Sequence, residues 1–180
     1  MLETERLMMT PLKREDLPWL IEMRSPEPVN RFLGGIERQN AEELATRMNF
    51  YLDCHERLGF GFCKFELKST GEYIGTGGLQ PLEDTDEIEV GYNFSEKYWR
   101  QGFGYEVAMA WLKYGFETVG LDRIVAVADP ENKGSWRIME KCGMQYEHTE
   151  VHYGMDCVYY AISREEFLKS PSNDISIRLG

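Results

Sequence analysis

The sequence has few of the features that mark secreted, disulfide-bonded or membrane-spanning proteins. Its four cysteines form no CxxC pair, and no apolar run reaches the roughly 18–20 residues that a membrane span needs. The first residues, MLETER, are charged and lack the apolar centre of a signal peptide. We therefore expect a cytoplasmic protein that binds no membrane and whose cysteines are buried free thiols.

Basic residues and histidines are also scarce. The chain has 20 Lys and Arg against 31 Asp and Glu, a net charge of −11, which disfavours nucleic-acid binding and is compatible with a cationic substrate. Of the three histidines, His148 and His152 have the spacing of metal ligands on a helix. They fall on a predicted strand, where their side chains would lie about 13 Å apart, so we expect no metal site.

What the chain does have is enough apolar material for one core. Hydrophobic residues make up 42% of the 180 residues and aromatics 13%. No repeat or flexible linker interrupts the middle of the chain. We expect one domain over residues 1–169 and a loose tail over residues 170–180, where Ser, Pro and Asn gather.

Hydrophobic periodicity predicts an alternation of strands and helices. Asn40 and Glu43 form a capping-box pattern before an amphipathic helix that reaches His55, and 25–28 is a proline-containing loop. Further helices are expected near 17–21, 102–119 and 135–142. The predicted strands are residues 7–10, 61–67, 72–79, 88–94, 124–128, 144–152 and 155–163.

The order of these elements predicts the sheet. A helix joins the strands 88–94 and 124–128, so these two should be parallel in a right-handed crossover. The other neighbours are joined mostly as hairpins. The fold class is therefore α/β (α+β), with a mixed, mostly antiparallel, seven-stranded sheet and helices on both faces.

The segment Arg100-Gln101-Gly102-Phe103-Gly104-Tyr105 follows a strand and opens a helix. Its glycines permit close approach of the backbone, and the free N–H groups of the helix start favour an anion such as a pyrophosphate. A plain tight turn is the alternative interpretation. A dinucleotide site is disfavoured because Val107 replaces the third glycine, and no Gly-Lys-Ser/Thr sequence supports a Walker A loop.

A second polar cluster, Asp129 to Ser135, follows the next parallel strand and opens the next helix. Since parallel strands end at the same edge of a sheet, this cluster should lie beside the loop that carries Gly102 and Gly104. Ligands bind at such edges in open α/β sheets.

Taken together, these segments resemble the GNAT N-acetyltransferase superfamily over about residues 2–167. The similarity is carried by Glu89-Val90-Gly91-Tyr92, by Tyr98 to Tyr105, by Asn132-x-x-Ser135 and by Glu140-Lys141-Cys142-Gly143-Met144. Thr4-Glu5-Arg6-Leu7, Pro11-Leu12, Asp16-Leu17 and Ile74-Gly75-Thr76 are similar to its RimJ/RimL-like branch, the ribosomal-protein-alanine N-acetyltransferases.

The resemblance implies a site for acetyl-CoA as co-substrate. Gln101 and Gly104 match the family's phosphate loop, while Glu106 stands where a small residue is usual and the usual glutamate two residues later is Ala108. That carboxylate either weakens CoA binding or points away and serves the helix start. The residues expected to bind acetyl-CoA are Tyr92, Asn93, Phe94, Arg100, Gln101, Gly102, Phe103, Gly104, Tyr105, Glu106, Asn132 and Ser135.

The resemblance also implies catalytic roles. Glu89 matches the family's carboxylate and is the first candidate for the general base, with Glu87 on the same strand face as the reserve; a solvated carboxylate is the alternative for both. Backbone amides near Phe94 would stabilise the oxyanion. Ser135 would support the departing thiolate, or be an ordinary first-turn serine. Asn132 would bind the pantetheine arm, or only cap its helix.

We therefore expect an acyltransferase that moves acetyl from acetyl-CoA to a primary amine, either a small molecule or a protein N-terminus. The acceptor should lie between residues 25–39 and the hairpin near 148–156. A non-catalytic CoA-binding sensor or interaction module on the same fold is one alternative, and a nucleotide-binding α/β domain is another. A monomer or a homodimer is expected.

Overall fold

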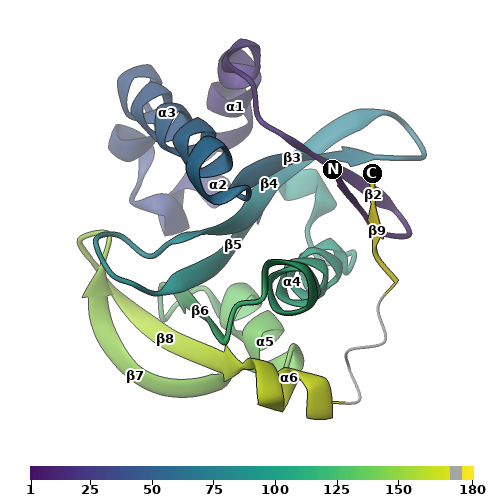
Figure 1. Cartoon of the computed structure of the whole chain (residues 1–180). Coiled ribbons are helices and arrows are strands. Elements are labelled where there is room, and N and C mark those ends of the chain that lie inside the picture. The colour runs from purple at the N-terminus through teal and green to yellow at the C-terminus, as the bar shows by residue number, and fades with distance from the viewer. Residues whose placement is uncertain (171–175) are drawn as a thin grey trace.

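The computed structural model describes residues 1–170 and 176–180 and contains a nine-stranded mixed sheet (Figure 1). The strand order is β7-β8-β6-β5-β4-β3-β2-β1-β9, and β5 and β6 form the parallel pair. The strands are β1 (Leu2–Glu3), β2 (Leu7–Pro11), β3 (Phe62–Leu67), β4 (Glu72–Pro81), β5 (Ile88–Phe94), β6 (Arg123–Ala128), β7 (Gln145–His152), β8 (Met155–Ser163) and β9 (Arg178–Leu179).

Helices cover both faces of the sheet, as Figure 1 shows, with α1 to α3 on one face and α4 to α6 on the other. They are α1 (Leu17–Arg24), α2 (Glu27–Asn30), α3 (Ala41–Leu58), α4 (Phe103–Lys113), α5 (Lys133–Lys141) and α6 (Arg164–Lys169). In the described residues, none of them combines the length and apolar character that crossing a bilayer requires.

Each face of the sheet has its own core. Residues of α4, α5 and α6, including Val107, Met139 and Phe167, pack on one face in one cluster. Leu20 of α1 and Leu44 of α3 pack on the other face in a second cluster. All four cysteines are buried and free, as predicted.

Helix α3 shows how local sequence sets an element. The side chain of Asn40 accepts hydrogen bonds from the amides of Glu42 and Glu43, which satisfies two donors at the helix start. Gly59 ends the helix in the left-handed conformation, with φ of 76°. The predicted amphipathic helix and its Asn40 cap are therefore confirmed, while the described contacts of Glu43 do not include the return bond of a capping box.

The parallel crossover is confirmed, and it leaves the two strands joined at one end only. The recorded register between β5 and β6 is the single pair Glu89 and Val125. On its other edge β5 is paired with β4 as far as Phe94. Beyond Glu89 the edge of β5 that faces β6 is therefore open.

Several predictions are corrected. The sheet has nine strands rather than seven, because β1 and β9 add two-residue strands whose length gives no periodic signal. Part of the predicted tail is thus a strand, while residues 171–175 lie outside the described residues. The predicted 102–119 helix is α4 followed by a π-helical segment, Tyr114–Val119, and the predicted loop at 25–28 contains the start of α2.

Candidate active site

A cavity of about 380 Å³ lies where β5 and β6 separate. Val90 to Asn93 of β5 and Val127 and Ala128 of β6 line it, together with residues of α1, α3 and the turn between β7 and β8. Tyr92, Asn93, Asn132, Ser135 and Glu89 are the predicted site residues in its wall.

Glu89 is a buried carboxylate in the cavity wall. The residue is 5% exposed, and its carboxylate accepts hydrogen bonds from Gln80 Nε2 at 2.5 Å and from the hydroxyl of Tyr153. Burial raises the pKa of Glu89 above its ordinary value of 4.5, and the two hydrogen bonds oppose that rise. The alternative of a solvated carboxylate is therefore wrong for Glu89.

Glu87, the reserve candidate, has a different environment. It precedes β5, is about 37% exposed in its side chain, and lies 3.3 Å from Arg123 Nε. It does not line the cavity. Of the two carboxylates, Glu89 has the location and the desolvation that a base requires.

Gln80 and Tyr153 are functional candidates that the sequence did not reveal. Gln80 faces Glu89 across the β4–β5 ladder, which the register between the strands determines. Tyr153 comes from the turn between β7 and β8 in a left-handed conformation, with φ of 52°. Its contact with Glu89 spans 64 residues of sequence, and no local pattern encodes it.

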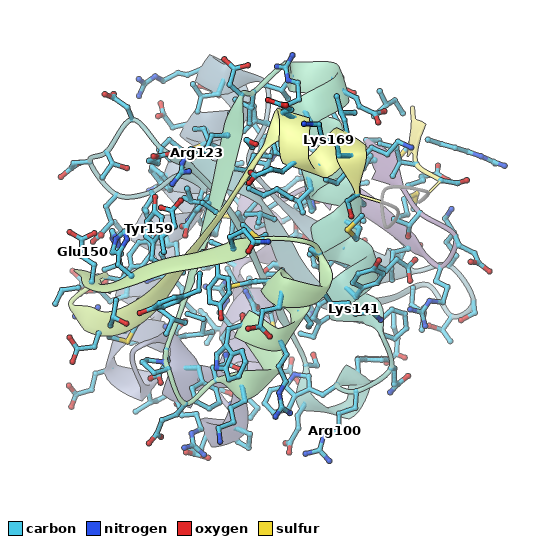
Figure 2. All side chains as sticks on the ribbon, turned by 90° about the horizontal axis from the view of Figure 1, so that it is seen from below. Arg100, Arg123, Lys141, Glu150, Tyr159 and Lys169 are labelled. Atoms are coloured by element: carbon cyan, nitrogen blue, oxygen red, sulfur yellow. The ribbon has the colours of Figure 1, made fainter. Side chains whose placement is uncertain are left out.

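The predicted phosphate loop is a left-handed turn that opens α4. Arg100 and Gly102 have φ of 60° and 83°, and Gly102 occupies the N-cap position without a side-chain cap. The first N–H groups of α4 therefore point outward without the usual partner. Arg100 is exposed and stands clear of the ribbon in Figure 2, free to meet an anion at this helix end.

Gly104 packs the loop against α5 and the cavity. A Cβ added there would lie 2.7 Å from Ile138 Cδ1 and 3.4 Å from Tyr92 Cε2. The hydroxyl of Tyr92 in turn donates to the carbonyl of Ser135 at 3.5 Å. Tyr92 therefore connects the loop to the cavity wall, and the two clusters lie together as predicted.

Glu106 turns away from the loop opening. Its carboxylate accepts hydrogen bonds from Thr4 Oγ1 at 2.5 Å and Arg6 Nε at 2.6 Å, and Arg6 Nη1 donates to the carbonyl of Gln101. The side chain of Glu106 is thus used to hold Arg6, and is not directed at a bound anion. Arg6 bonds the loop although it lies 95 residues before Gln101 in the sequence, and it was not among the predicted residues.

Asn132 and Ser135 lie in the cavity wall at the start of α5. Asn132 Oδ1 accepts from the Ser135 amide at 3.2 Å, so the capping role foreseen for Asn132 is present. Its Nδ2 donors remain available to a ligand. Ser135 is partly exposed in the cavity wall, and its hydroxyl has no hydrogen-bond partner among the described residues.

The side chains of the remaining predicted cofactor residues are engaged elsewhere in the fold. Phe94 and Phe103 are buried in the core with ring centroids 6.2 Å apart, and neither lines the cavity. Lys141 lies over the ring of Tyr105 at 4.1 Å. The Gln101 side chain donates to the carbonyl of Lys97. These side chains are therefore held by contacts within the protein.

Opposite the strands, the cavity is closed by the two segments predicted to flank the acceptor. Phe32, Leu33 and Arg38 come from the segment after α1, and Tyr153 and Met155 from the closing hairpin. Arg38 joins the two because its guanidinium donates to the carbonyl of Tyr153. Among the described residues, no cluster of His, Cys, Asp and Glu could hold a metal ion.

Comparison with known proteins identifies the family. Residues 6–145 match the model of the acetyltransferase (GNAT) domain. The chain therefore belongs to the GNAT acetyltransferase family, which consists of acyl-transferring enzymes. The buried glutamate and the left-handed loop that opens α4 lie inside the matched range.

Individual relatives agree with this assignment. The chain is 31% identical to the Bacillus subtilis N-acetyltransferase YoaA over 81% of this chain and 83% of that protein. Two other curated relatives, at 41% and 39% identity, match this chain over only about half of their own length. A GNAT acetyltransferase structure from Bacillus anthracis is 29% identical, with a TM-score of 0.74 over 92% of this chain and 99% of that chain.

A more distant structure shares the fold. A Vibrio cholerae spermidine N-acetyltransferase, solved with CoA and spermine, is 18% identical, with a TM-score of 0.74 over 91% of this chain and 99% of that chain. At this identity the similarity extends to the fold alone.

Proposed function

We propose that this chain transfers the acetyl group of acetyl-CoA to a primary amine, with Glu89 as the general base. The observation that carries the proposal is the buried carboxylate of Glu89 in the wall of a cavity at the point where β5 and β6 separate. Glu89 is buried, and among the described residues its carboxylate has two hydrogen bonds and no ion pair. Family membership supports the reaction class.

The loop at the start of α4 would bind the diphosphate of CoA. Its fitness rests on an N-cap glycine that leaves the helix amides uncovered and on the exposed cation of Arg100. Tyr92 leads from this loop to Ser135. The open edge of β5 and the side-chain amide of Asn132 would then bind the pantetheine arm in the cavity between β5 and β6.

Glu89 would take the proton that activates the acceptor. A lysine-like amine has a pKa of about 10.4 and is mostly protonated at neutral pH, so it cannot attack until a base removes a proton. Glu89, directly or through one water, accepts that proton. The free amine then attacks the thioester carbonyl carbon, and a C–N bond forms.

The open edge of β5 and Ser135 would serve the later stages. Backbone N–H groups of β5 beyond residue 90 have no β6 partner and can donate to the oxyanion. The nitrogen of the tetrahedral intermediate loses its extra proton to water, the C–S bond breaks, and the electron pair leaves on sulfur. The hydroxyl of Ser135 donates a hydrogen bond to the thiolate, which takes its proton from water.

Within the family we place the chain in the RimJ/RimL-like branch, because its N-terminal sequence Thr4-Glu5-Arg6-Leu7 is similar to that branch. In the structure, Thr4 and Arg6 hold the N-terminal segment against α4, because both donate hydrogen bonds to Glu106. We also propose a cytoplasmic monomer or homodimer.

Two measurements test the proposal. Acetyl-CoA should raise the melting temperature of the protein more than NADH or ATP at equal concentration. Thiol release from acetyl-CoA should then appear with at least one member of a panel of primary amines. Stabilisation without release for any amine would instead support the CoA-binding module, and no stabilisation would refute the assignment of the loop.

A further inference from the structure

Arg24, the last residue of α1, is a buried cation in the cavity wall. It is 1% exposed, and its Nη2 donates to Thr76 Oγ1 at 3.1 Å. Its Nε and Nη1 are buried without a hydrogen-bond partner. The other buried cation, Lys64, has Asp16 at 2.7 Å, and Arg24 has no such counterion among the described residues.

An unpaired buried guanidinium is unfavourable on its own. Burial lowers the pKa of Arg24, yet a guanidinium keeps its proton in proteins and its charge remains. Burying N–H donors without acceptors costs desolvation free energy. This cost is offset only when an anion or another acceptor binds to them. Arg24 therefore has the chemistry of a binding group whose ligand is an anion.

The position of Arg24 separates it from the base. Thr76, to which Arg24 is bonded, pairs with Asn93, whereas Gln80 and Glu89 pair four residues further along the same two strands. At about 3.3 Å per residue this is a separation of roughly 13 Å between backbone levels. Guanidinium and carboxylate thus lie at opposite ends of one cavity.

The neighbouring charges have the same arrangement, with positive charge at the Arg24 end of the cavity and negative charge at the Glu89 end. Arg47 of α3 lies near Arg24 and lines the cavity as well. At the other end, Glu83 follows β4 beyond Gln80, where it accepts from His152 and the amide of Tyr153. Arg38 adds one positive charge at that end, where it donates to the Tyr153 carbonyl, and the carboxylates of Glu83, Asp84 and Glu89 outnumber it.

We propose that the acceptor is an amine that also carries a carboxylate, and that Arg24 binds this carboxylate through its unused N–H donors. The inference rests on the proposed acetyl transfer and adds the class of acceptor. A zwitterion matches both ends of the cavity, with its amine toward Glu89. A polyamine would place a cation against Arg24 and Arg47, which is repulsive.

The test compares matched acceptors. Amino acids of several chain lengths, each with its methyl ester and its phosphonate analogue, and spermidine are assayed for thiol release with acetyl-CoA. We expect kcat/KM for the best acid to exceed that of its ester by at least tenfold. Arg24→Met should lower kcat/KM for the acid about 10- to 100-fold, mainly through KM, and leave the ester and the acetyl-CoA Kd unchanged.

Two further variants separate binding from folding. Arg24→Lys keeps the charge and should recover part of the preference for the acid. Arg57→Met, which removes an exposed cation paired with Asp53 on α3, should change nothing. If Arg24→Met does not fold, the acid-to-ester ratio of the wild type and of Arg24→Lys decides the question.

The outcomes are distinct from those of the proposed function. Thermal shifts with the same acids and esters, in the presence of CoA, report binding even where no amine is acetylated. Acid-selective binding that Arg24→Met abolishes supports the subsite with or without turnover. Equal response to acid and ester, or a preference for spermidine or for the phosphonate, would overturn it.

Discussion

At the scale of single residues, the site depends on how its environment changes ordinary side chains. Glu89 is the clearest case, because burial favours its neutral form while Tyr153 and Gln80 donate to its ionised form. Burial and the two hydrogen bonds therefore act on the pKa of Glu89 in opposite directions. We therefore propose Gln80 and Tyr153 as positioning residues for the proposed base, and both can be tested through the titration of Glu89.

Replacing the base should remove activity without removing stability. Glu89→Gln should lower kcat about 10²- to 10⁴-fold, the usual contribution of a general base. Its melting temperature at pH 7 should be equal or higher. The raised pKa of Glu89 means that its contribution to stability is full below the unfolded pKa and is lost as pH rises through the folded pKa.

The new amide at position 89 can be accommodated. The buried Oε1 of Gln80 has no hydrogen-bond partner, and it can accept from the new NH2 group if the Gln80 amide rotates by 180°. Glu87→Gln is the matched control and should keep wild-type rates. Normal turnover by Glu89→Gln, with loss in the control, would reverse the two assignments.

The pH profile gives a second prediction at the same scale. In the wild type, kcat/KM should rise with pH, with a midpoint above 4.5 that reports Glu89. Tyr153→Phe removes a donor that stabilises the carboxylate, so the pKa of Glu89 and this midpoint should move to higher pH. An unmoved midpoint in this variant, measured over the same pH range, would show that Glu89 is not the titrating group.

At the scale of elements, the start of α4 determines what the loop can bind. Gly102 adopts a left-handed conformation and leaves the helix without a side-chain cap. An added Cβ would meet only Arg6 Nη2, at 3.5 Å, so the space over the helix end is open to a ligand. The turn that the sequence left as an alternative is therefore present, and it also leaves the first amides of α4 without a side-chain cap.

Gly102→Ala can be compared with Gly59→Ala, since Gly59 ends α3 with a similar φ of 76° and open space around it. Each variant should lose about 1–2 kcal/mol of stability from left-handed strain. Only Gly102→Ala should raise the acetyl-CoA Kd, by tenfold or more, because its methyl group enters the ligand space. Denaturant titration and calorimetry measure the two effects. Equal acetyl-CoA affinity in both variants would exclude the loop as the phosphate site.

At the scale of the whole molecule, the sequence predicted what local pattern encodes. The α3 helix, the central strands and the crossover follow from periodicity and capping, and Glu89 and the α4 loop follow from family motifs. Residues brought in by distant contacts were not predictable. Arg24, Arg6 and Tyr153 acquire their roles only when α1, the N-terminal segment and the last hairpin close around β5.

Arg6 links the N-terminal segment to the loop, because it bonds both Glu106 and the carbonyl of Gln101. Arg6→Met should leave the Glu106 carboxylate, in a residue 9% exposed, without its cation and release the Gln101 carbonyl. We expect a stability loss of about 1–3 kcal/mol and a several-fold rise in the acetyl-CoA Kd.

Arg164→Met is the matched control, since Arg164 is similarly exposed, pairs with Asp122 and donates to the carbonyls of Gly120 and Leu121 beyond the other end of α4. It should also lose stability, though less, because the side chain of Asp122 is 99% exposed. Its acetyl-CoA Kd should stay at the wild-type value, because its bonds lie at the other end of α4. Chemical denaturation and calorimetry on both variants separate the effects. A parallel rise in Kd in the control would mean that general loosening of the fold, and not the link from Arg6 to Gln101, governs the loop.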